Sequence, residues 1–233
     1  MAHTTPRAAG PHDGRRSAAA ARRRLREKEI LAATRALFDE RGVRDAQIED
    51  IARAVGTNRA IIYRHFSGKE ELFALTLVGY LDELRERLEK VGAGLDDPRD
   101  RLAAQVAAFV DFGVEFPAFV DCAQTIMRRP GPELLEEISE SALFRLGRGI
   151  SSCLALVSAT LDDGVARGDF RIADTTLLAN HMYASGLGAL QLARIGMIVK
   201  EAAPGIPMIT PVSAEEVKKY LIATSLALAN LPT

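Results

Sequence analysis

A short stretch near the N-terminus carries the side chains best suited to contacting DNA. An arginine guanidinium can bond guanine O6 and N7 or a phosphate, and a tyrosine can donate to a phosphate and cover a thymine methyl group. Arg59, Tyr63 and Arg64 lie at helical spacing and share one face. We expect this face to enter a DNA groove; the alternative is a helix that only packs. The predicted DNA-contacting residues are Gln47, Thr57, Asn58, Arg59, Ala60, Tyr63, Arg64, His65 and Lys69.

The elements that position these residues can be predicted from the same stretch. Residues 47–73 indicate a short helix, a tight turn at Gly56, a second short helix, a break at Ser67 and Gly68, and a new helix. Two short helices joined by a turn that contains glycine are typical of a helix-turn-helix, whose second helix enters the major groove. Because each helix is too short to be stable alone, both must pack on a third helix.

The pattern resembles the DNA-binding domain of the TetR family of bacterial transcriptional regulators. The resemblance spans more than twenty residues, extends back through the helix of residues 30–41, and covers the remaining two-thirds of the chain only in helical character and length. It implies a homodimer that binds a palindromic operator and responds to an effector. The matching residues are Ile51-Ala52, Val55-Gly56, Arg59, Ile62-Tyr63, Phe66, Lys69-Glu70 and Leu72-Phe73.

The chain departs from the family pattern at a few positions. The family usually has threonine at one or both of the positions held here by Ala46 and Gln47, so we expect Asp45 to cap the helix and the Gln47 amide to contact a phosphate. Thr57 replaces a common valine and Asn58 a common serine. Because asparagine is an equally good N-cap residue, the fold is unaffected and only the details of base reading differ.

Charge is distributed unevenly along the chain. The 233 residues have the composition of a soluble globular protein, with 48% hydrophobic and 26% charged residues. Residues 1–68 hold fourteen basic and eight acidic residues, a net +6, whereas the remainder holds sixteen and twenty-three, a net −7. This asymmetry favours one end that binds nucleic acid, although chance clustering of arginines in a tail is the alternative.

Other functional classes lack their motifs. The sequence has no GxSxG, Walker or HExxH motif, and its two cysteines, Cys122 and Cys153, have neither metal-ligand spacing nor a disulfide framework. We therefore expect that the protein is not an enzyme and that it binds neither a metal ion nor a cofactor. The N-terminus lacks the apolar region of a signal peptide, and residues 177–199, the most apolar stretch, are interrupted by polar residues. We expect a cytoplasmic protein with no membrane partner.

We predict an all-α protein with two domains. Residues 1–21 are predicted to be a flexible basic tail, residues 22–68 the helix-turn-helix domain, and residues 69–233 a larger helical domain for effector binding and dimerisation, with the helix of residues 69–91 as connector. In the larger domain we expect helices over residues 99–116, 117–129, 132–167, 174–201 and 213–230, with a loop over 202–212.

Aromatic and flexible apolar side chains are dense in the larger domain. Helical bundles form ligand sites from facing helices, so we expect a cavity for a small, largely apolar effector, with plain core packing as the alternative. Gln105, Gln124, His181 and Gln191 are polar residues in apolar stretches that can orient a ligand or simply be satisfied elsewhere. The predicted effector-binding residues are Phe109, Phe112, Phe116, Cys122, Met127, Phe144, His181 and Met182.

The last two long helices are expected to form the homodimer. Small residues around Gly188 allow another helix to approach closely, and Leu226 belongs to an apolar stripe. The resemblance implies that these helices pair across a two-fold axis; packing within one chain is the alternative.

The predicted function is a ligand-responsive, homodimeric transcriptional repressor. The alternatives are an activator or dual regulator, an architectural DNA-binding protein without an effector and, least favoured, an enzyme.

Overall fold

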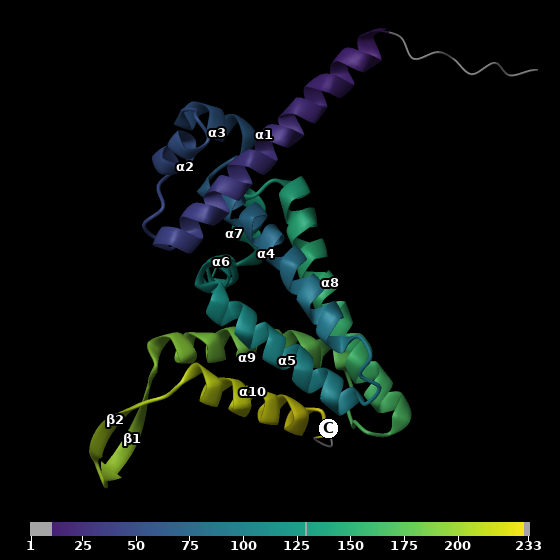
Figure 1. Cartoon of the computed structure of the whole chain (residues 1–233), viewed down its shortest axis with the longest axis vertical. Helices are drawn as coiled ribbons and strands as arrows, with labels where there is room; N and C mark the ends of the chain where they lie inside the picture. The colour runs from purple at the N-terminus through teal and green to yellow at the C-terminus, as the bar shows by residue number, and fades with distance from the viewer. Residues whose placement is uncertain (1–10, 129, 231–233) are drawn as a thin grey trace, which may run out of the picture. The chain divides into compact units, whose positions relative to one another are not determined.

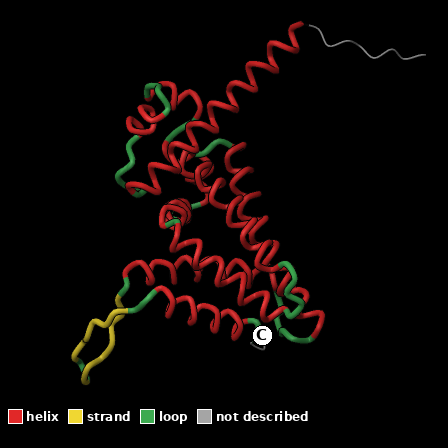
Figure 2. The backbone as a smooth tube through the Cα atoms, viewed as in Figure 1, coloured by secondary structure: helices red, strands yellow, loops and turns green. Residues whose placement is uncertain are grey.

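The computed structural model describes residues 11–128 and 130–230. Two compact units divide it, one ending at Phe66 and the other beginning at Ser67. Helices make up both units apart from one hairpin, as Figure 2 shows, and the predicted all-α fold is confirmed. The first ten residues of the predicted tail, and Arg129, lie outside the described residues.

The first unit contains three helices, α1 (Pro11–Arg41), α2 (Ile48–Ala54) and α3 (Arg59–His65). One face of α1 is buried, with Ile30, Thr34 and Phe38 each at most 1% exposed. The helix ends where Gly42, at φ 81°, donates its N–H to the Phe38 carbonyl. Helix α1 packs against α2, and α2 against α3, which supplies the support that these short helices require.

Helix α1 begins earlier than predicted. We expected a flexible tail up to residue 21, but the helix includes residues 11–21. Four consecutive alanines, at positions 18–21, explain the difference because alanine has the highest helix propensity. Pro11 also suits the first turn of a helix, where its missing N–H costs nothing.

The turn between α2 and α3 is closed by backbone hydrogen bonds. Gly56 adopts φ 64° and donates to the Arg53 carbonyl at 3.1 Å, while Thr57 donates to the Ala52 carbonyl at 2.8 Å. This pair of bonds is the Schellman arrangement, which requires a left-handed residue and therefore favours glycine. The guanidinium of Arg26 in α1 also bonds the Val55 carbonyl at 2.9 Å, which ties the turn to α1.

The second unit is a helical bundle with one hairpin (Figure 1). Helix α4 packs against α5, α6 and α8, while α5, α8 and α9 contact one another and α10 packs on α5 and α9. Its elements are α4 (Lys69–Gly92), α5 (Pro98–Glu115), α6 (Pro117–Met127), α7 (Gly131–Glu137), α8 (Glu140–Arg167), α9 (Thr175–Ile195), β1 (Met197–Ala203), β2 (Ile206–Pro211) and α10 (Ala214–Leu228).

One helix predicted over residues 132–167 is in fact two. Ser139 interrupts it because its hydroxyl caps α8, accepting the Ala142 N–H at 3.3 Å, and donates to the Glu71 carboxylate. Glu71 also accepts the backbone N–H of Ser67. The break therefore joins the beginning of α4 to the beginning of α8.

Residues predicted as a helix end and a loop form an antiparallel hairpin. Helix α9 ends at Gly196, which has φ 67°, and strands β1 and β2 follow with Val199 paired to Ile209. Pro204 and Gly205, the latter at φ 76°, form the connecting turn, and this dipeptide is typical of type II turns. In a sheet of two strands each strand has one unpaired edge, where the missing N–H of a proline breaks no ladder hydrogen bond. The prolines of β2 are therefore tolerated. In Figure 1 the hairpin extends away from the helices of its unit.

One helix of the described residues, α8, is long and apolar enough to be compared with a membrane-spanning helix. The comparison rests on length and composition only, which core helices of soluble proteins match as well, and α8 packs against α4, α5 and α9.

Candidate DNA-binding surface and ligand cavity

Helix α3 divides its side chains between the interior and the solvent. Ile62 is 1% exposed and Phe66, which follows the helix, is 2% exposed. On the outer face Arg59, Tyr63 and Arg64 are exposed, as is Ala60. The structure thus brings the predicted basic and aromatic residues together on one accessible face, where nothing in the unit's core depends on them.

The residues that precede α3 have structural partners. The Asn58 side chain accepts the Ile61 N–H at 3.1 Å and so caps the helix, which leaves its NH₂ group for another contact. Thr57 is half-buried beside the turn. Gln47, not Asp45, is the N-cap of α2, and its exposed side chain makes no capping bond. The predicted cap at Asp45 is therefore wrong, and the Gln47 amide stays available.

Arg59 is held by side chains of both α2 and α3. Its guanidinium lies 3.1 Å from a Glu49 carboxylate oxygen and 5.7 Å from the centre of the Tyr63 ring. Both Arg59 and Glu49 are more than half exposed, and exposed ion pairs of this kind contribute only about 0–1 kcal/mol. The contact therefore orients the guanidinium and can be exchanged for a nucleic-acid acceptor at small cost.

His65 and Lys69 differ from the other candidates. His65 is half-buried, and both its burial and the positive charge of Arg23 lower its pKa, so the ring of the free protein is neutral at pH 7. Lys69 begins α4 in the second unit, with Nζ 5.1 Å from the centre of the Phe73 ring. The three N–H donors of its ammonium group remain available for a phosphate, because a contact with an aromatic ring involves only the positive charge.

The second unit contains a partly open cavity of about 60 Å³. Five helices contribute to its wall, α4, α5, α8, α9 and α10. Its lining is almost entirely carbon, and the polar groups in it belong to Gln105, Cys153, Tyr183 and Ser225. The apolar lining residues are Leu81, Leu84, Leu88, Val106, Phe109, Ile150, Leu154, Val157, Ala179, Met182 and Leu221.

Only two of the predicted effector-binding residues, Phe109 and Met182, line this cavity. Phe112 and Phe116 instead form an aromatic cluster with Tyr80 and Phe119, in which the Phe112 and Phe116 ring centres lie 5.0 Å apart. Cys122 is fully buried in α6, which does not contribute to the wall. Phe112, Phe116 and Cys122 are therefore not part of the cavity lining, contrary to the prediction. The number of aromatic residues in a stretch of sequence does not indicate whether a given ring lies in the core or at the cavity.

The other three predicted effector-binding residues face solvent. Phe144 is 71% exposed and Met127 53% exposed, and His181 is exposed as well. The prediction also omitted α4 and α10, which both contribute to the wall. In the sequence, the leucines of α4 that line the cavity cannot be distinguished from leucines of the ordinary core.

The polar residues of the lining are uncharged. Burial raises the pKa of the Tyr183 phenol to about 12 and that of the Cys153 thiol to about 11. The thiol donates to the Leu81 carbonyl, with sulfur and oxygen 3.3 Å apart. Gln105 is 4% exposed and donates through Nε2 to the Leu156 carbonyl at 3.4 Å. Within the described residues, no group of three or more histidine, cysteine or acidic side chains can hold a metal ion.

Comparisons with known proteins identify the family. Residues 30–76 match the bacterial regulatory proteins of the tetR family. The transcriptional activator FasR of Mycolicibacterium smegmatis is 34% identical over 87 residues, which cover 37% of this chain and 40% of FasR. The transcriptional repressor KstR2 of Mycobacterium tuberculosis is 26% identical over 186 residues, covering 73% of this chain and 87% of KstR2. The chain belongs to the TetR family of transcriptional regulators.

Solved TetR-like structures share the fold over both units. The structure of RolR with its ligand resorcinol has a TM-score of 0.66 at 19% identity and covers 91% of each chain. KstR2 of Mycobacterium tuberculosis has a TM-score of 0.57 at 23% identity, covering 88% of this chain and 95% of that one. At these identities the likeness establishes the fold alone.

The two residues predicted for a TetR-type dimer contact differ in their surroundings. Gly188 lies on an exposed part of α9, and a side chain built there would meet no atom within 4 Å. Leu226 of α10 is only partly buried and packs against an internal cluster that includes Leu102, Phe170 and Met182. Gly188 is therefore open to a partner, whereas Leu226 is largely used within its own unit.

Proposed function

We propose that this TetR-family protein is a ligand-responsive transcriptional repressor that binds a palindromic operator as a homodimer. The observation that carries the proposal is the outer face of α3, where Arg59, Tyr63 and Arg64 are exposed on a helix capped by Asn58 and oriented by the Gly56 turn. A basic and aromatic helix face of this kind suits the major groove and its phosphates. Action on the chromosome would occur in the cytoplasm, and no catalytic step is involved.

Assembly as a dimer is supported by the hairpin. Two isolated strands are marginally stable in water, and large exposed apolar patches mark interaction surfaces. We assign the hairpin, together with the open surface at Gly188, to contact with a second copy of the chain. The exposed apolar side chains of the hairpin are Met197, Val199, Ile206, Met208 and Ile209.

Effector response is supported by the cavity in the second unit. A ligand that binds one dimer state better than another shifts the population toward that state and changes operator affinity by the same coupling free energy. KstR2 and RolR illustrate that repression and ligand binding occur among proteins of this fold.

An activator is the second candidate. FasR, which is 34% identical over the matched residues, is a transcriptional activator. A reporter gene placed behind the selected operator separates the two, since deletion of the regulator raises expression under a repressor and lowers it under an activator.

The experiment that tests the proposal measures operator binding by Arg59→Ala and Tyr63→Ala variants. DNA selected from a random pool by the wild-type protein provides the operator, and fluorescence anisotropy gives the affinity. We expect each change to weaken binding by about 1–3 kcal/mol, with Arg59→Ala also relaxing sequence preference. Helix content should not change, because both side chains are exposed.

Arg148→Ala is the matched control. Arg148 is an exposed arginine on α8, outside the helix-turn-helix. Equal operator affinity of the wild type and both α3 variants would contradict the assignment of α3 as the recognition helix. DNA selection that returns no shared sequence would favour an architectural protein instead.

A further inference from the structure

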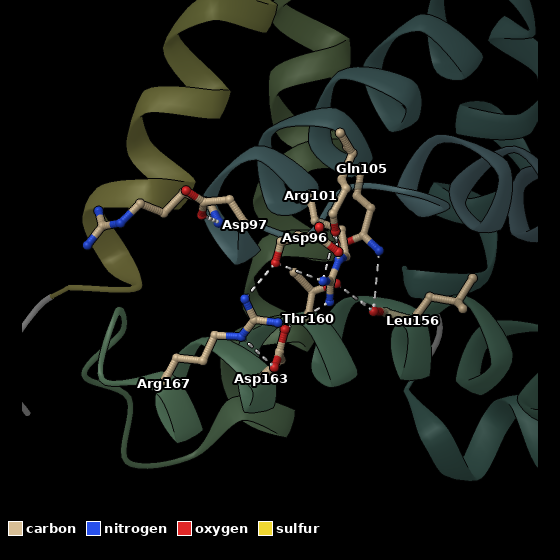
Figure 3. Close-up of polar contacts among 10 residues, drawn as sticks. Asp96, Asp97, Arg101, Gln105, Leu156, Thr160, Asp163 and Arg167 are labelled. Atoms are coloured by element: carbon tan, nitrogen blue, oxygen red, sulfur yellow. Dashed lines mark hydrogen bonds and ion pairs between the residues drawn. The ribbon is translucent and has the colours of Figure 1, made fainter.

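Gln105 is a buried side chain with one half of its amide in use. It lies on α5, is 4% exposed, and lines the cavity. Figure 3 shows its Nε2 directed at the Leu156 carbonyl of α8, at 3.4 Å. Because a carbonyl can only accept, the nitrogen must face Leu156, and this assigns the orientation of the amide.

The backbone that carries Gln105 is fixed by its neighbours. One turn earlier on α5, Arg101 bonds the Leu95 carbonyl at 2.8 Å and the Asp163 carboxylate at 3.2 Å. Arg167 reaches the same carboxylate and the Asp96 carbonyl, so the loop before α5 and the end of α8 are joined (Figure 3). The backbone at Gln105 is therefore held in place.

The other half of the amide has no partner. Oε1 of Gln105 is buried and accepts no hydrogen bond from any described residue. Buried polar atoms in proteins are nearly always hydrogen-bonded, and an orphaned acceptor carries its full desolvation cost. The cavity that Gln105 lines has a volume of about 60 Å³, enough for at least one water, and it is partly open, so a molecule larger than this volume can still place one end in it. A donor from a bound molecule can occupy this space.

The rest of the wall selects against charge. No aspartate, glutamate, lysine or arginine lines the cavity. Tyr183 and Cys153 have raised pKa values and are neutral at pH 7. An ionised ligand would lose its hydration without gaining a counter-charge, which is strongly unfavourable.

We propose that the cavity binds a neutral, compact and mainly apolar molecule that carries one hydroxyl or N–H donor, and that this donor bonds Oε1 of Gln105. The inference rests on the proposed function, since it names the chemical class of the effector. The carbon lining made by side chains such as Leu84, Phe109 and Met182 accommodates the apolar body. Gln105 is thus the residue that distinguishes a hydroxylated ring from the corresponding hydrocarbon.

Three probes of similar size test the proposal by titration calorimetry on the full chain. Phenol and toluene differ only in a hydroxyl replaced by a methyl group, and benzoate is charged. We expect phenol to bind about tenfold more tightly than toluene, as one net hydrogen bond allows. Benzoate should show no binding.

Variants assign the discrimination to Gln105. In Gln105→Leu the preference for phenol over toluene should disappear or reverse, and Gln105→Met serves as a second variant if the first does not fold. Gln124→Leu is the matched control, because Gln124 lies on α6 outside the cavity and bonds Gln191 at 2.6 Å. That variant should keep the wild-type preference.

Several results would overturn the inference. The first is equal affinity of the wild type for phenol and toluene, which would mean that water satisfies Oε1. The second is binding of benzoate, and the third is the absence of binding by all three probes. Operator binding in the presence of phenol separates this failure from failure of the proposed function. Phenol binding that depends on Gln105 but leaves operator affinity unchanged would refute effector coupling and leave the ligand class standing.

Discussion

The two units use their candidate functional residues in opposite ways. In the first unit these residues lie on the outside of one seven-residue helix, and its core of Ile30, Phe38 and Ile62 is complete without them. In the second unit they lie inside, where five helices meet around a cavity. An exposed contact surface can thus change its chemistry without changing stability, whereas an internal binding site shares its residues with the core.

This contrast also explains how each site is encoded. Which residues of α3 face outward follows from spacing along a single helix, a period of 3.6 residues. Which residues of α4 and α10 face the cavity depends on how separate helices pack, and no local pattern records that. The following changes test the contrast, beginning with the largest expected effect.

Phe112→Ala should destabilise the second unit by about 3–5 kcal/mol. Phe112 is fully buried, with its ring centre 5.2 Å from that of Phe119 and the Arg87 guanidinium 4.9 Å from its ring. Truncation removes these contacts and leaves a void. Urea denaturation measures the loss. Phe144→Ala, at a 71% exposed position, should cost less than about 0.5 kcal/mol. Equal costs for the two variants would contradict the assignment of Phe112 to the core.

Val199→Lys should weaken dimerisation by about 1.5–3 kcal/mol, the value of burying one such side chain. Val199 is 74% exposed and pairs with Ile209, which is 67% exposed, so both are open to a second copy. Sedimentation equilibrium measures the dimer dissociation constant. Lys200→Gln on the same strand is the control. A monomeric wild type, or a variant that dimerises normally, would remove the hairpin from the proposed interface.

Glu71→Gln should reduce stability by about 1–3 kcal/mol at neutral pH. Burial raises the pKa of Glu71, but hydrogen bonds from Ser139 and Ser67 outweigh it and hold the pKa below the usual 4.5. A depressed folded-state pKa contributes stability that is present above the unfolded pKa and is lost as pH falls through the folded value.

The acid dependence provides the specific measurement for Glu71. Wild-type stability should therefore decline below about pH 4.5 more steeply than that of Glu71→Gln. Urea denaturation at several pH values, with Glu133→Gln at an exposed site as control, gives both slopes. Parallel slopes for the wild type and Glu71→Gln would show that this carboxylate does not link α4 to α8.

Glu49→Gln should raise operator affinity by up to about 1 kcal/mol. The change frees the Arg59 guanidinium from its 3.1 Å ion pair and removes a negative charge from the surface expected to meet phosphates. Stability should not change, since both side chains are exposed. Anisotropy at low and high salt, with Glu40→Gln as control, measures the effect. Weaker binding would mean that the ion pair orients Arg59 productively in the complex.

Local features were predictable because neighbours in the chain decide them. Gly56 closes the α2–α3 turn as expected, and Asn58 caps α3 by accepting the Ile61 N–H. Asp174 and the Ser213–Glu216 capping box likewise begin α9 and α10, at the predicted starts of residues 174 and 213. The exposed face of α3 follows from the same local order, because a helix once begun sets the direction of every side chain on it.

Breaks and turns that depend on distant partners were not predictable. Ser139 ends a continuous apolar pattern because Glu71, sixty-eight residues earlier, accepts its hydroxyl. For the hairpin after Gly196 the sequence predicts a helix end and a loop, because prolines disfavour strands in general, although an outer edge tolerates them.

By itself the sequence determined the family, the helical fold and the face of α3 that is exposed, since each depends on residue types at short, regular spacings. Only the tertiary structure decided that Phe112 belongs to the core, that Phe144 faces solvent, and that Gln105 lines the cavity with an unpaired acceptor. The physical reason is that interior packing is a property of helices brought together from distant parts of the chain. The same apolar stripe can face a neighbouring helix, a cavity or a second molecule, and periodicity is identical in all three cases.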